Sequence, residues 1–335
     1  MILIDSLYIN DSGGFRLLQY LVRELRKRSV DFYLLADSRC AGAFDDLPFV
    51  EYMRASMSNR ARWYQRDMSA FSSVLCFGNI PAPRKLKIPV YTYFHNIHLL
   101  TLSEAHSLPF WIKSWLKREV YRCCKNNTDF WLVQTSNTAT ELQRHLRERA
   151  DRVKLMPFYE LPEGLSRLKA EAHGNDYVYI STYVPGKGHA ELLTAWRLLH
   201  DRGVDIKLHL TVPLDCPFAE TLNEAKCDGV LVENHGLIPF EQVIELYHQS
   251  KAIIYPSHNE SLGLGIVEAA TAGCDVLGSD LPFLHAICQP SGVFDSFSPE
   301  SIANAVVEYE RKGAGRTELL IENQIDDLIT LINKN

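Results

Sequence analysis

The sequence has 335 residues, 46% hydrophobic and 23% charged, which is the composition of a soluble globular protein with room for two domains. No apolar run approaches the roughly 18 to 20 residues of a membrane-spanning helix, and we expect the N-terminus to be a strand and not a signal peptide. The net charge of −6 is uneven, because residues 1–157 contain 23 Lys and Arg against 15 Asp and Glu, and residues 158–335 contain 12 against 26. The two halves therefore suggest different duties, and the acidic whole argues against a nucleic-acid partner.

The eight cysteines do not form a metal-binding pattern. None lies in a CxxC or Cys/His spacing, and most have apolar neighbours. We therefore expect reduced thiols, as in a cytosolic protein, and no metal ion held by the chain.

Short apolar strands alternate with helical segments through the first half, residues 1–160. An amphipathic helix follows residues 10–14, and another carries Leu142 and Leu146. The expected strands are 2–4, 31–36, 74–77, 89–94, 130–133 and 153–156. This alternation predicts a parallel, doubly wound sheet.

Two places in this half suit a ligand. Gly13 and Gly14 stand at a strand-to-helix turn, where the absence of side chains lets a ligand approach the backbone at the positive end of a helix. His95 stands at the carboxyl end of its strand, the edge at which open α/β sheets bind ligands. The alternatives are a structural histidine and a glycine turn that holds nothing.

The segment 109–125 is rich in tryptophan and basic residues and is amphipathic on a helical projection. Trp111 and Trp115 share one side with aliphatic residues, and Lys and Arg lie mostly opposite. This composition is typical of a helix on an anionic membrane surface. The alternative is a surface helix that buries its tryptophans in the core.

A second domain is expected over residues 161–315, followed by a C-terminal helix at 316–335 that can pack back on the first domain. Its strands are expected at 177–180, 206–212, 229–232, 252–256 and 274–280, again alternating with helices. The loop after the first strand contains Lys187, flanked by glycines. It is not a P-loop, because the hydroxyl position after the lysine is Gly188, but Lys187 remains a candidate cation for a phosphate.

Residues 257–268 combine a polar loop, two glycines and the start of a helix directly after a buried strand, so free backbone N–H groups face the loop. Glu260 lies in the loop, and Glu268 lies about one and a half turns into the helix, where side chains tilt back toward the N-terminus. Both carboxylates can therefore face one ligand. The alternative is that Glu268 only complements the helix dipole. A glutamate also replaces the third glycine of a dinucleotide fingerprint, which argues against a nicotinamide site.

Four sequence motifs occur in order between Tyr177 and Asp280. They are Pro185-Gly186-Lys187-Gly188, His235-Gly236-Leu237-Ile238-Pro239, the run from Tyr255 to Glu268, and Gly273-Cys274-Asp275-Val276-Leu277-Gly278-Ser279-Asp280. In these four motifs the chain resembles the GT-B glycosyltransferases of the large retaining family 4. Gly13-Gly14, His95 and Val133-Gln134-Thr135-Ser136 are looser matches. The resemblance implies an α/β fold with two tandem Rossmann-like, doubly wound domains and an inter-domain cleft.

The resemblance also implies a role for each matching residue. Glu260 would hold hydroxyls of the transferred sugar near the reacting carbon, Lys187 would meet the diphosphate, and His95 would contact the sugar from the first domain. Glu268 would hold the ribose hydroxyls of the donor. The other donor-binding positions are Gly13, Gly14, Thr182, Leu237, Ile238, Gly263 and Leu264.

One departure from the family concerns the phosphates. The family usually has an arginine five residues before the lysine, where this chain has Thr182, so a second cation is missing or comes from elsewhere. A lysine and helix N-termini can still stabilise a departing nucleoside diphosphate. The sequence contains no Asp-x-Asp, so we expect no metal bridge to the diphosphate and no cofactor.

These inferences predict a metal-independent, retaining glycosyltransferase of the hexosyltransferase type. It would move a sugar from a UDP- or GDP-sugar to a lipid-linked oligosaccharide or polysaccharide in bacterial surface-glycan assembly of the O-antigen or capsule type. We expect it in the cytoplasm, peripheral on the inner face of the membrane, with 109–125 as the contact. The alternatives are a sugar-nucleotide epimerase or phosphorylase, and a catalytically silent sugar-nucleotide-binding protein.

Overall fold

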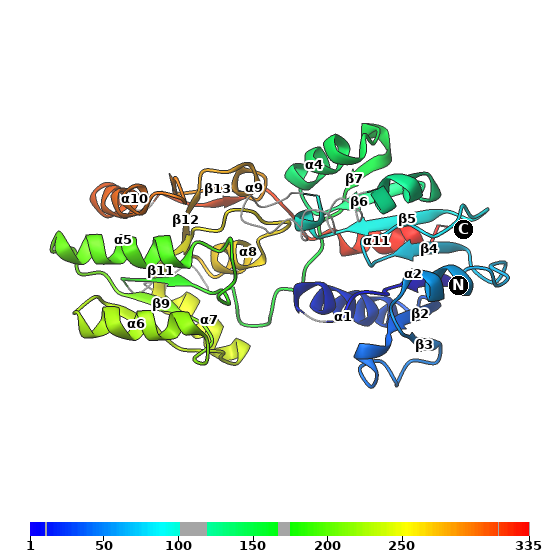
Figure 1. The fold of residues 1–335 in the computed structure, drawn as a ribbon, viewed down its shortest axis with the longest axis horizontal. Helices are drawn as coiled ribbons and strands as arrows, with labels where there is room; N and C mark the ends of the chain where they lie inside the picture. The colour runs from blue at the N-terminus through cyan, green and yellow to red at the C-terminus, as the bar shows by residue number, and fades with distance from the viewer. Residues whose placement is uncertain (11, 101–118, 167–174, 314, 335) are drawn as a thin grey trace. The chain divides into compact units, whose positions relative to one another are not determined.

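The computed structural model describes every residue except 11, 101–118, 167–174, 314 and 335. The chain forms two units, one of Met1–Glu160 with Glu322–Asn335 and one of Leu161–Ile321 (Figure 1). Each unit is a parallel sheet with helices packed on it, so the predicted α/β class with two doubly wound domains is confirmed. The inter-domain cleft stays a prediction.

The sheet of the first unit has seven parallel strands in the order β3-β2-β1-β4-β5-β6-β7. The strands are β1 (Ile2–Asp5), β2 (Phe32–Asp37), β3 (Val50–Met53), β4 (Ser73–Cys76), β5 (Val90–Phe94), β6 (Phe130–Val133) and β7 (Val153–Leu155). The helices are α1 (Ser12–Lys27), α2 (Met57–Trp63), α4 (Ser136–Leu146) and α11 (Ile325–Ile332), with short 3-10 turns η1 (Ser38–Cys40), η2 (Ile97–Leu99), η3 (Lys125–Asn127) and η4 (Ala150–Arg152). The strand order reverses between β1 and β4, the kind of point at which open α/β sheets form ligand crevices.

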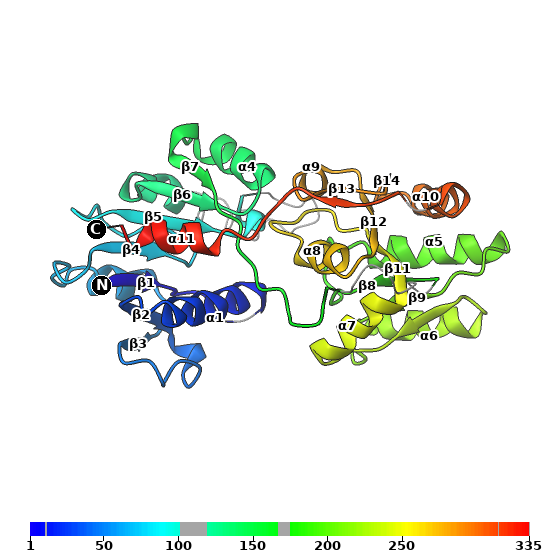
Figure 2. The same cartoon turned by 180° about the vertical axis from the view of Figure 1, so that it is seen from behind.

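Alternate residues of β1 face opposite sides of this sheet, because side chains on a strand alternate. Ile2 and Ile4 pack with α1 and α11 in one buried cluster, and Leu3 packs with the end of α2 in another. Figure 2 shows α1 and α11 along the same face of the sheet. The centre of the sheet is therefore buried under apolar side chains on both faces.

The C-terminal end of the chain differs in part from the predicted helix at 316–335. Glu318–Leu319 form β15, which pairs antiparallel with β13 (Cys288–Gln289) of the second unit, so the last helix begins only at Ile325. The second unit accordingly continues to Ile321, beyond the predicted end of the domain at residue 315. From there α11 packs on α1 and β4 of the first unit.

The sheet of the second unit has six parallel strands in the order β10-β9-β8-β11-β12-β14. The strands are β8 (Asp176–Tyr179), β9 (Leu208–Leu210), β10 (Val232–Asn234), β11 (Ser250–Tyr255), β12 (Asp275–Ser279) and β14 (Gly292–Phe294). The helices are α5 (His189–Asp201), α6 (Pro217–Cys227), α7 (Phe240–Gln249), α8 (Leu264–Thr271), α9 (Pro282–His285) and α10 (Pro299–Lys312). Here the order reverses between β8 and β11, which places the loops after those two strands side by side.

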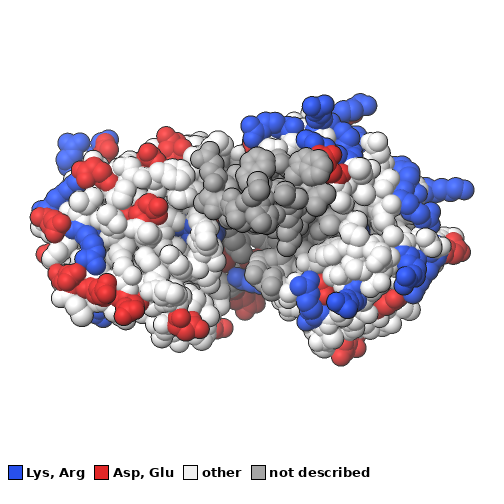
Figure 3. All heavy atoms as spheres, in the orientation of Figure 1, with Lys and Arg blue, Asp and Glu red and all other residues white. Residues whose placement is uncertain are grey.

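Most of the predicted interfacial helix at 109–125 lies outside the described residues, including Trp111 and Trp115. Residues 119–124 are helical, and Tyr121 is buried. Within the described ranges, no helix combines the length and the apolar character that crossing a bilayer requires. Lys and Arg predominate on the face of the first unit seen in Figure 3, and Asp and Glu are frequent on that of the second, as the charge counts indicate.

Candidate active site

The candidate site of the second unit lies where the strand order reverses. Residues 180–188 follow β8 and lead into α5, and residues 256–263 follow β11 and lead into α8. Gly188 has a φ of +67°, and a Cβ on it would stand 2.3 Å from the carbonyl oxygen of Pro256. Only glycine therefore lets the two loops approach this closely.

The carboxylate of Glu260 is the centre of this site. Its Oε1 forms an ion pair with the ammonium of Lys187, and it accepts hydrogen bonds from the Tyr255 hydroxyl at 3.0 Å and the Ser257 hydroxyl at 2.7 Å. The side chains of Glu260 and Lys187 are 12% and 24% exposed, so their attraction is screened less than that of a surface pair. None of the described residues donates a hydrogen bond to Oε2, which leaves this oxygen for a ligand.

The hydroxyl of Tyr255 acts only as a donor in this cluster. Burial raises its pKa well above the usual 10, and the nearby negative charge of Glu260 raises it further. The phenol therefore stays protonated across the working range of a protein. Its hydrogen bond and that of Ser257 hold the carboxylate in one orientation, which is what a residue that positions a substrate requires.

Glu268 lies in the second turn of α8 and is buried, at 4% exposed. Its Oε2 accepts a hydrogen bond from the Tyr247 hydroxyl at 3.2 Å. α8 begins after Gly263, whose φ of +62° is open to glycine and costly for other residues. The backbone N–H groups at Gly263 and Leu264 stand at the N-terminus of this helix, where an anion is stabilised.

The remaining predicted donor residues of the second unit are more exposed. Thr182 is exposed in the same loop as Lys187, and no Lys or Arg other than Lys187 occurs in residues 180–188 or 256–263. Leu237 is 72% exposed, and Ile238 is partly buried beside it in the loop after β10. The structure therefore brings Lys187, Glu260 and the start of α8 together. Leu237 lies apart from them, in the loop after β10.

In the first unit, the predicted residues His95 and Gly14 are in contact. A Cβ on Gly14 would stand 3.0 Å from His95 Nε2, so glycine allows the imidazole to lie against the first turn of α1. Asn79 orients this histidine, because its Oδ1 accepts from the backbone N–H of His95 at 2.8 Å. A Cβ on Gly13 would meet nothing within 4 Å, so packing does not require glycine there.

Burial lowers the pKa of His95 from 6.5 to about 4, so the ring is neutral at pH 7. The unfolded chain therefore binds more protons than the folded chain between about pH 6.5 and 4, and the free energy of unfolding falls as the pH falls. We expect the stability advantage of the wild type over His95→Asn to shrink by about 2 to 3 kcal/mol between pH 7 and pH 4.5.

Urea unfolding at the two pH values measures this change. The matched control is His285→Asn, which removes a histidine whose side chain is 49% exposed. Burial also lowers the pKa of His189 to about 4. His189 is present in every variant, so its contribution to the pH dependence cancels in the comparison. A difference between wild type and His95→Asn that does not vary with pH would contradict the prediction.

Four residues that sequence reasoning did not select support those that it did. They are Tyr255 and Ser257 beside Glu260, Tyr247 beside Glu268, and Asn79 beside His95. Asn79 has a φ of +66°, and a sequence does not show a left-handed asparagine. Tyr255 and Ser257 belong to the motif from Tyr255 to Glu268, but the alternation of side chains along a strand does not tell which hydroxyl contacts a carboxylate.

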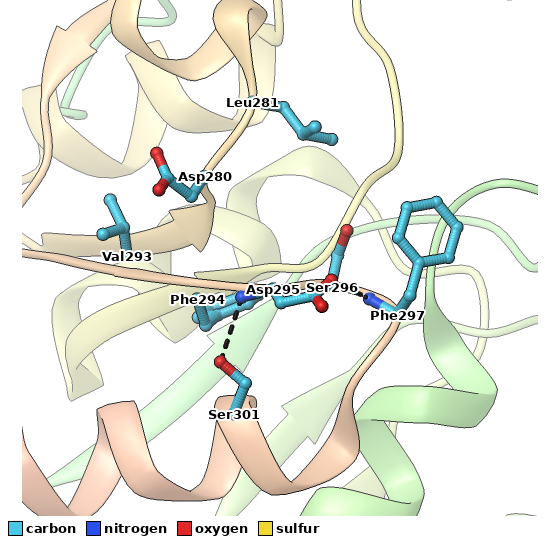
Figure 4. Close-up of a pocket in the computed structure, with 8 residues that line it drawn as sticks. All are labelled: Asp280, Leu281, Val293, Phe294, Asp295, Ser296, Phe297 and Ser301. Carbon is cyan, nitrogen blue, oxygen red and sulfur yellow. Dashed lines mark hydrogen bonds between the residues drawn. The ribbon is translucent and has the colours of Figure 1, made fainter.

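A separate pocket of about 340 Å³ lies beyond the ends of β12 and β14 (Figure 4). It is lined by Asp280, Leu281, Val293, Phe294, Asp295, Ser296, Phe297 and Ser301. The Phe297 ring lies 4.1 Å from the ring of His258, which belongs to the loop of Glu260. The pocket contains none of the predicted residues and no Lys or Arg, so the converging charges favour the site around Glu260 as the place of chemistry.

Known proteins resemble this chain in sequence. Residues 166–325 match the family described as "Glycosyl transferases group 1". The chain is 29% identical over 179 residues to the serotype-specific mannosyltransferase WbdA of Escherichia coli, a match that covers 50% of the chain and 22% of WbdA. It is 24% identical over 264 residues to the O-antigen chain mannosyltransferase B of Escherichia coli, covering 73% of the chain and 66% of that protein.

The fold has solved counterparts as well. The crystal structure of HepE from Anabaena in complex with UDP aligns with 93% of this chain and 90% of its own, with a TM-score of 0.67 and 16% identity. At this identity the likeness shows the fold alone, and the fold is that of the GT-B glycosyltransferases. Residues 166–325 of this chain are therefore similar to the glycosyl transferases group 1 family.

Proposed function

We propose that this protein is a retaining, metal-independent hexosyltransferase that moves a sugar from a UDP- or GDP-sugar to a lipid-linked oligosaccharide or polysaccharide acceptor. The observation that carries the proposal is the cluster of Glu260 and Lys187 beside the N-terminus of α8. The family match and the names of the two mannosyltransferases support it, and they favour surface-glycan assembly of the O-antigen type.

The donor would lie across the loops after β8 and β11. Cleavage of the bond between sugar and diphosphate leaves negative charge on the departing phosphate, which Lys187 and the backbone N–H groups of Gly263 and Leu264 stabilise. Glu260 Oε2 accepts from a sugar hydroxyl and fixes the ring relative to the acceptor. No covalent nucleophile is assigned to either glutamate, because a carboxylate pair alone does not establish that mechanism.

Because residue 182 is a threonine and not an arginine, the phosphate-binding part of the site has less positive charge than is usual in the family that the chain resembles. With Lys187 as the cation of the two loops, the helix N-terminus carries a larger share of the stabilisation. The ion pair to Glu260 keeps Lys187 in place before the donor binds. A donor phosphate would then share the ammonium with the carboxylate.

The acceptor side would be the first unit, with His95 near the sugar and a basic surface toward an anionic carrier or membrane. His95 is neutral at pH 7, so it takes part as a hydrogen-bonding group and not as a charge. Contact with the inner face of the cytoplasmic membrane through the segment 109–125 belongs to the same proposal.

A panel of UDP-, GDP- and ADP-sugars in a thermal-shift assay tests the proposal first. A true donor at 100 times its Kd should stabilise the protein by about 2.7 kcal/mol, and the others should not. Incubation of that donor with and without membrane acceptor then identifies the reaction. Sugar conversion without acceptor would indicate an epimerase, and failure of every nucleotide sugar to bind would overturn the proposal.

Glu268→Gln tests whether this buried carboxylate holds the ribose. We expect UDP or GDP, whichever is bound, to lose about 10-fold or more in affinity, because hydrogen bonds to a charged group contribute about 1.5 to 3 kcal/mol. The wild type should prefer the ribonucleotide to its 2′-deoxy form, and the variant should not. Calorimetric titration measures all four affinities.

The control for the helix-dipole alternative is Glu300→Gln, which removes an exposed first-turn carboxylate from α10 in the same unit. It should leave nucleotide affinity unchanged. If Glu268→Gln lowered thermal stability but kept the wild-type preference for the ribonucleotide, Glu268 would be a structural residue and not a ribose ligand.

A further inference from the structure

Four polar side chains meet on one face of the second unit's sheet, away from the strand reversal. Strand pairing puts His209 of β9 directly opposite Glu233 of β10. Because side chains alternate along a strand, His235 shares the face of Glu233, and Asp176 shares the face of Val178, the partner of His209 on β8. The topology alone therefore gathers two imidazoles and two carboxylates.

The distances within this cluster are short. His209 Nδ1 lies 3.0 Å from His235 Nε2 and 3.9 Å from Glu233 Oε2. One ligand atom from each of these three residues lies within 4.8 Å of the other two. On the other side of the His209 ring, Nε2 lies 3.0 Å from Asp176 Oδ2. His209 is 4% exposed, so its surroundings hold the ring in this position.

We propose that His209 Nδ1, His235 Nε2 and the carboxylate of Glu233 bind a zinc ion. Two imidazoles and a carboxylate are a usual three-residue ligand set for zinc, with water in the fourth position. Two nitrogens at about 2.0 to 2.1 Å from one tetrahedral ion stand roughly 3.3 Å apart, close to the separation here. Asp176 is the positioning residue, because a carboxylate on Nε2–H directs the lone pair of Nδ1 toward the metal.

The positions of the ring hydrogens in the cluster are compatible with zinc binding. With Nε2–H of His209 donated to Asp176, Nδ1 is an acceptor, and in the metal-free state the Nε2–H of His235 fills the gap between the rings. When zinc enters, that hydrogen moves to the other nitrogen of His235, and both imidazoles remain neutral ligands. Zinc therefore replaces one hydrogen bond and requires no change in the backbone.

Lys207 gives the proposal a sharp test. Its Nζ lies 3.7 Å from Glu233 Oε2 and competes with the ion for this carboxylate. Removing the competing charge with Lys207→Met should strengthen zinc binding several-fold, whereas a cluster that only forms hydrogen bonds would not respond. The side chain of Lys207 is 44% exposed, so the substitution should leave the fold unchanged.

Zinc would also fix the loop that begins at His235. The backbone N–H of His235 already donates to the carbonyl of Leu210 at 2.9 Å, and the ion adds a second link between this loop and β9. The loop continues to Leu237 and Ile238, two of the predicted donor-binding positions, so metal binding would order them, a consequence that rests on the proposed function. Zinc binding itself is measured without any nucleotide and stands independently.

The experiment titrates metal-stripped full-length protein with Zn²⁺ by calorimetry and with Co²⁺ by visible absorption. We expect one ion per chain and four- or five-coordinate Co²⁺ bands without sulfur charge transfer, which separates this site from the exposed Cys123 and Cys227. Glu233→Gln and His235→Asn should each weaken binding at least 10-fold. Asp176→Asn should weaken it about 10- to 100-fold.

The matched control is His285→Asn, which removes a histidine paired with a carboxylate, Asp280, elsewhere in the unit. It should bind zinc like the wild type, and melting curves of the metal-free variants establish that each is folded. Absence of a stoichiometric site, or binding that His235→Asn leaves unchanged, would overturn the proposal. Weaker binding in Lys207→Met would overturn the ligand role of Glu233.

Discussion

Glu260→Gln is expected to lower kcat for sugar transfer by about 100- to 1,000-fold, the scale of losing one preorganised group in a catalytic site. Glutamine keeps the shape of the side chain and its contacts with Tyr255 and Ser257 but removes the negative charge. In the proposed site the diphosphate meets Lys187, which the substitution frees from its ion pair. Affinity for the free nucleoside diphosphate should therefore be unchanged or slightly higher, so the loss appears in kcat.

Steady-state kinetics and calorimetric titration with the nucleoside diphosphate measure these two quantities separately. Glu308→Gln is the control, since Glu308 pairs with Lys312 on the surface of α10, with both side chains more than half exposed. Breaking such a pair should change neither quantity. Undiminished transfer by Glu260→Gln would end the assignment of this site. Equal losses of transfer and nucleotide affinity would make Glu260 a structural support of the loop.

The arrangement around Glu260 was predictable because its parts are local. The segment that contains Lys187 and the segment that contains Glu260 each consist of a buried strand, a loop with a left-handed glycine and the start of a helix. Parallel strands bring such loops to one edge of the sheet. Lys187 and Glu260, 73 residues apart, therefore meet although no local pattern connects them. The same logic placed His95 at the carboxyl end of its strand, whereas its contact with Gly14 is known only from the structure.

The parts that sequence reasoning missed depend on pairing between distant segments. Glu318–Leu319 fit a helical pattern locally, but their partner strand at Cys288–Gln289 makes them extended. His209 and His235 have no metal-ligand spacing along the chain, and only the register of β9 and β10 brings them together. Strand register is set by the whole sheet, so a single stretch of sequence does not reveal it.

Arg60→Met is expected to destabilise the first unit by about 3 to 5 kcal/mol, because it leaves the carboxylate of Asp5 buried without its charge partner. Arg60 and Asp5 are 2% and 1% exposed, and Arg60 Nε donates to Asp5 Oδ2 at 2.7 Å. The guanidinium also donates to the carbonyls of Pro81 and Ile80, at 2.8 and 2.9 Å. These residues follow Asn79, so the ion pair also holds the segment that orients His95.

Urea unfolding gives the loss of stability, and hydrogen exchange of peptides from β1 and β11 assigns it to a unit. Faster exchange is expected in β1 and not in β11.

Arg66→Met is the control, because Arg66 pairs with Glu51 at the surface and should contribute less than about 1 kcal/mol. Adding Asp5→Asn to Arg60→Met should recover part of the loss, since no unpaired charge then remains buried. A loss below about 1 kcal/mol in Arg60→Met, or a double variant less stable than the single one, would show that solvent reaches Asp5 and that the ion pair does not hold the loop after β4.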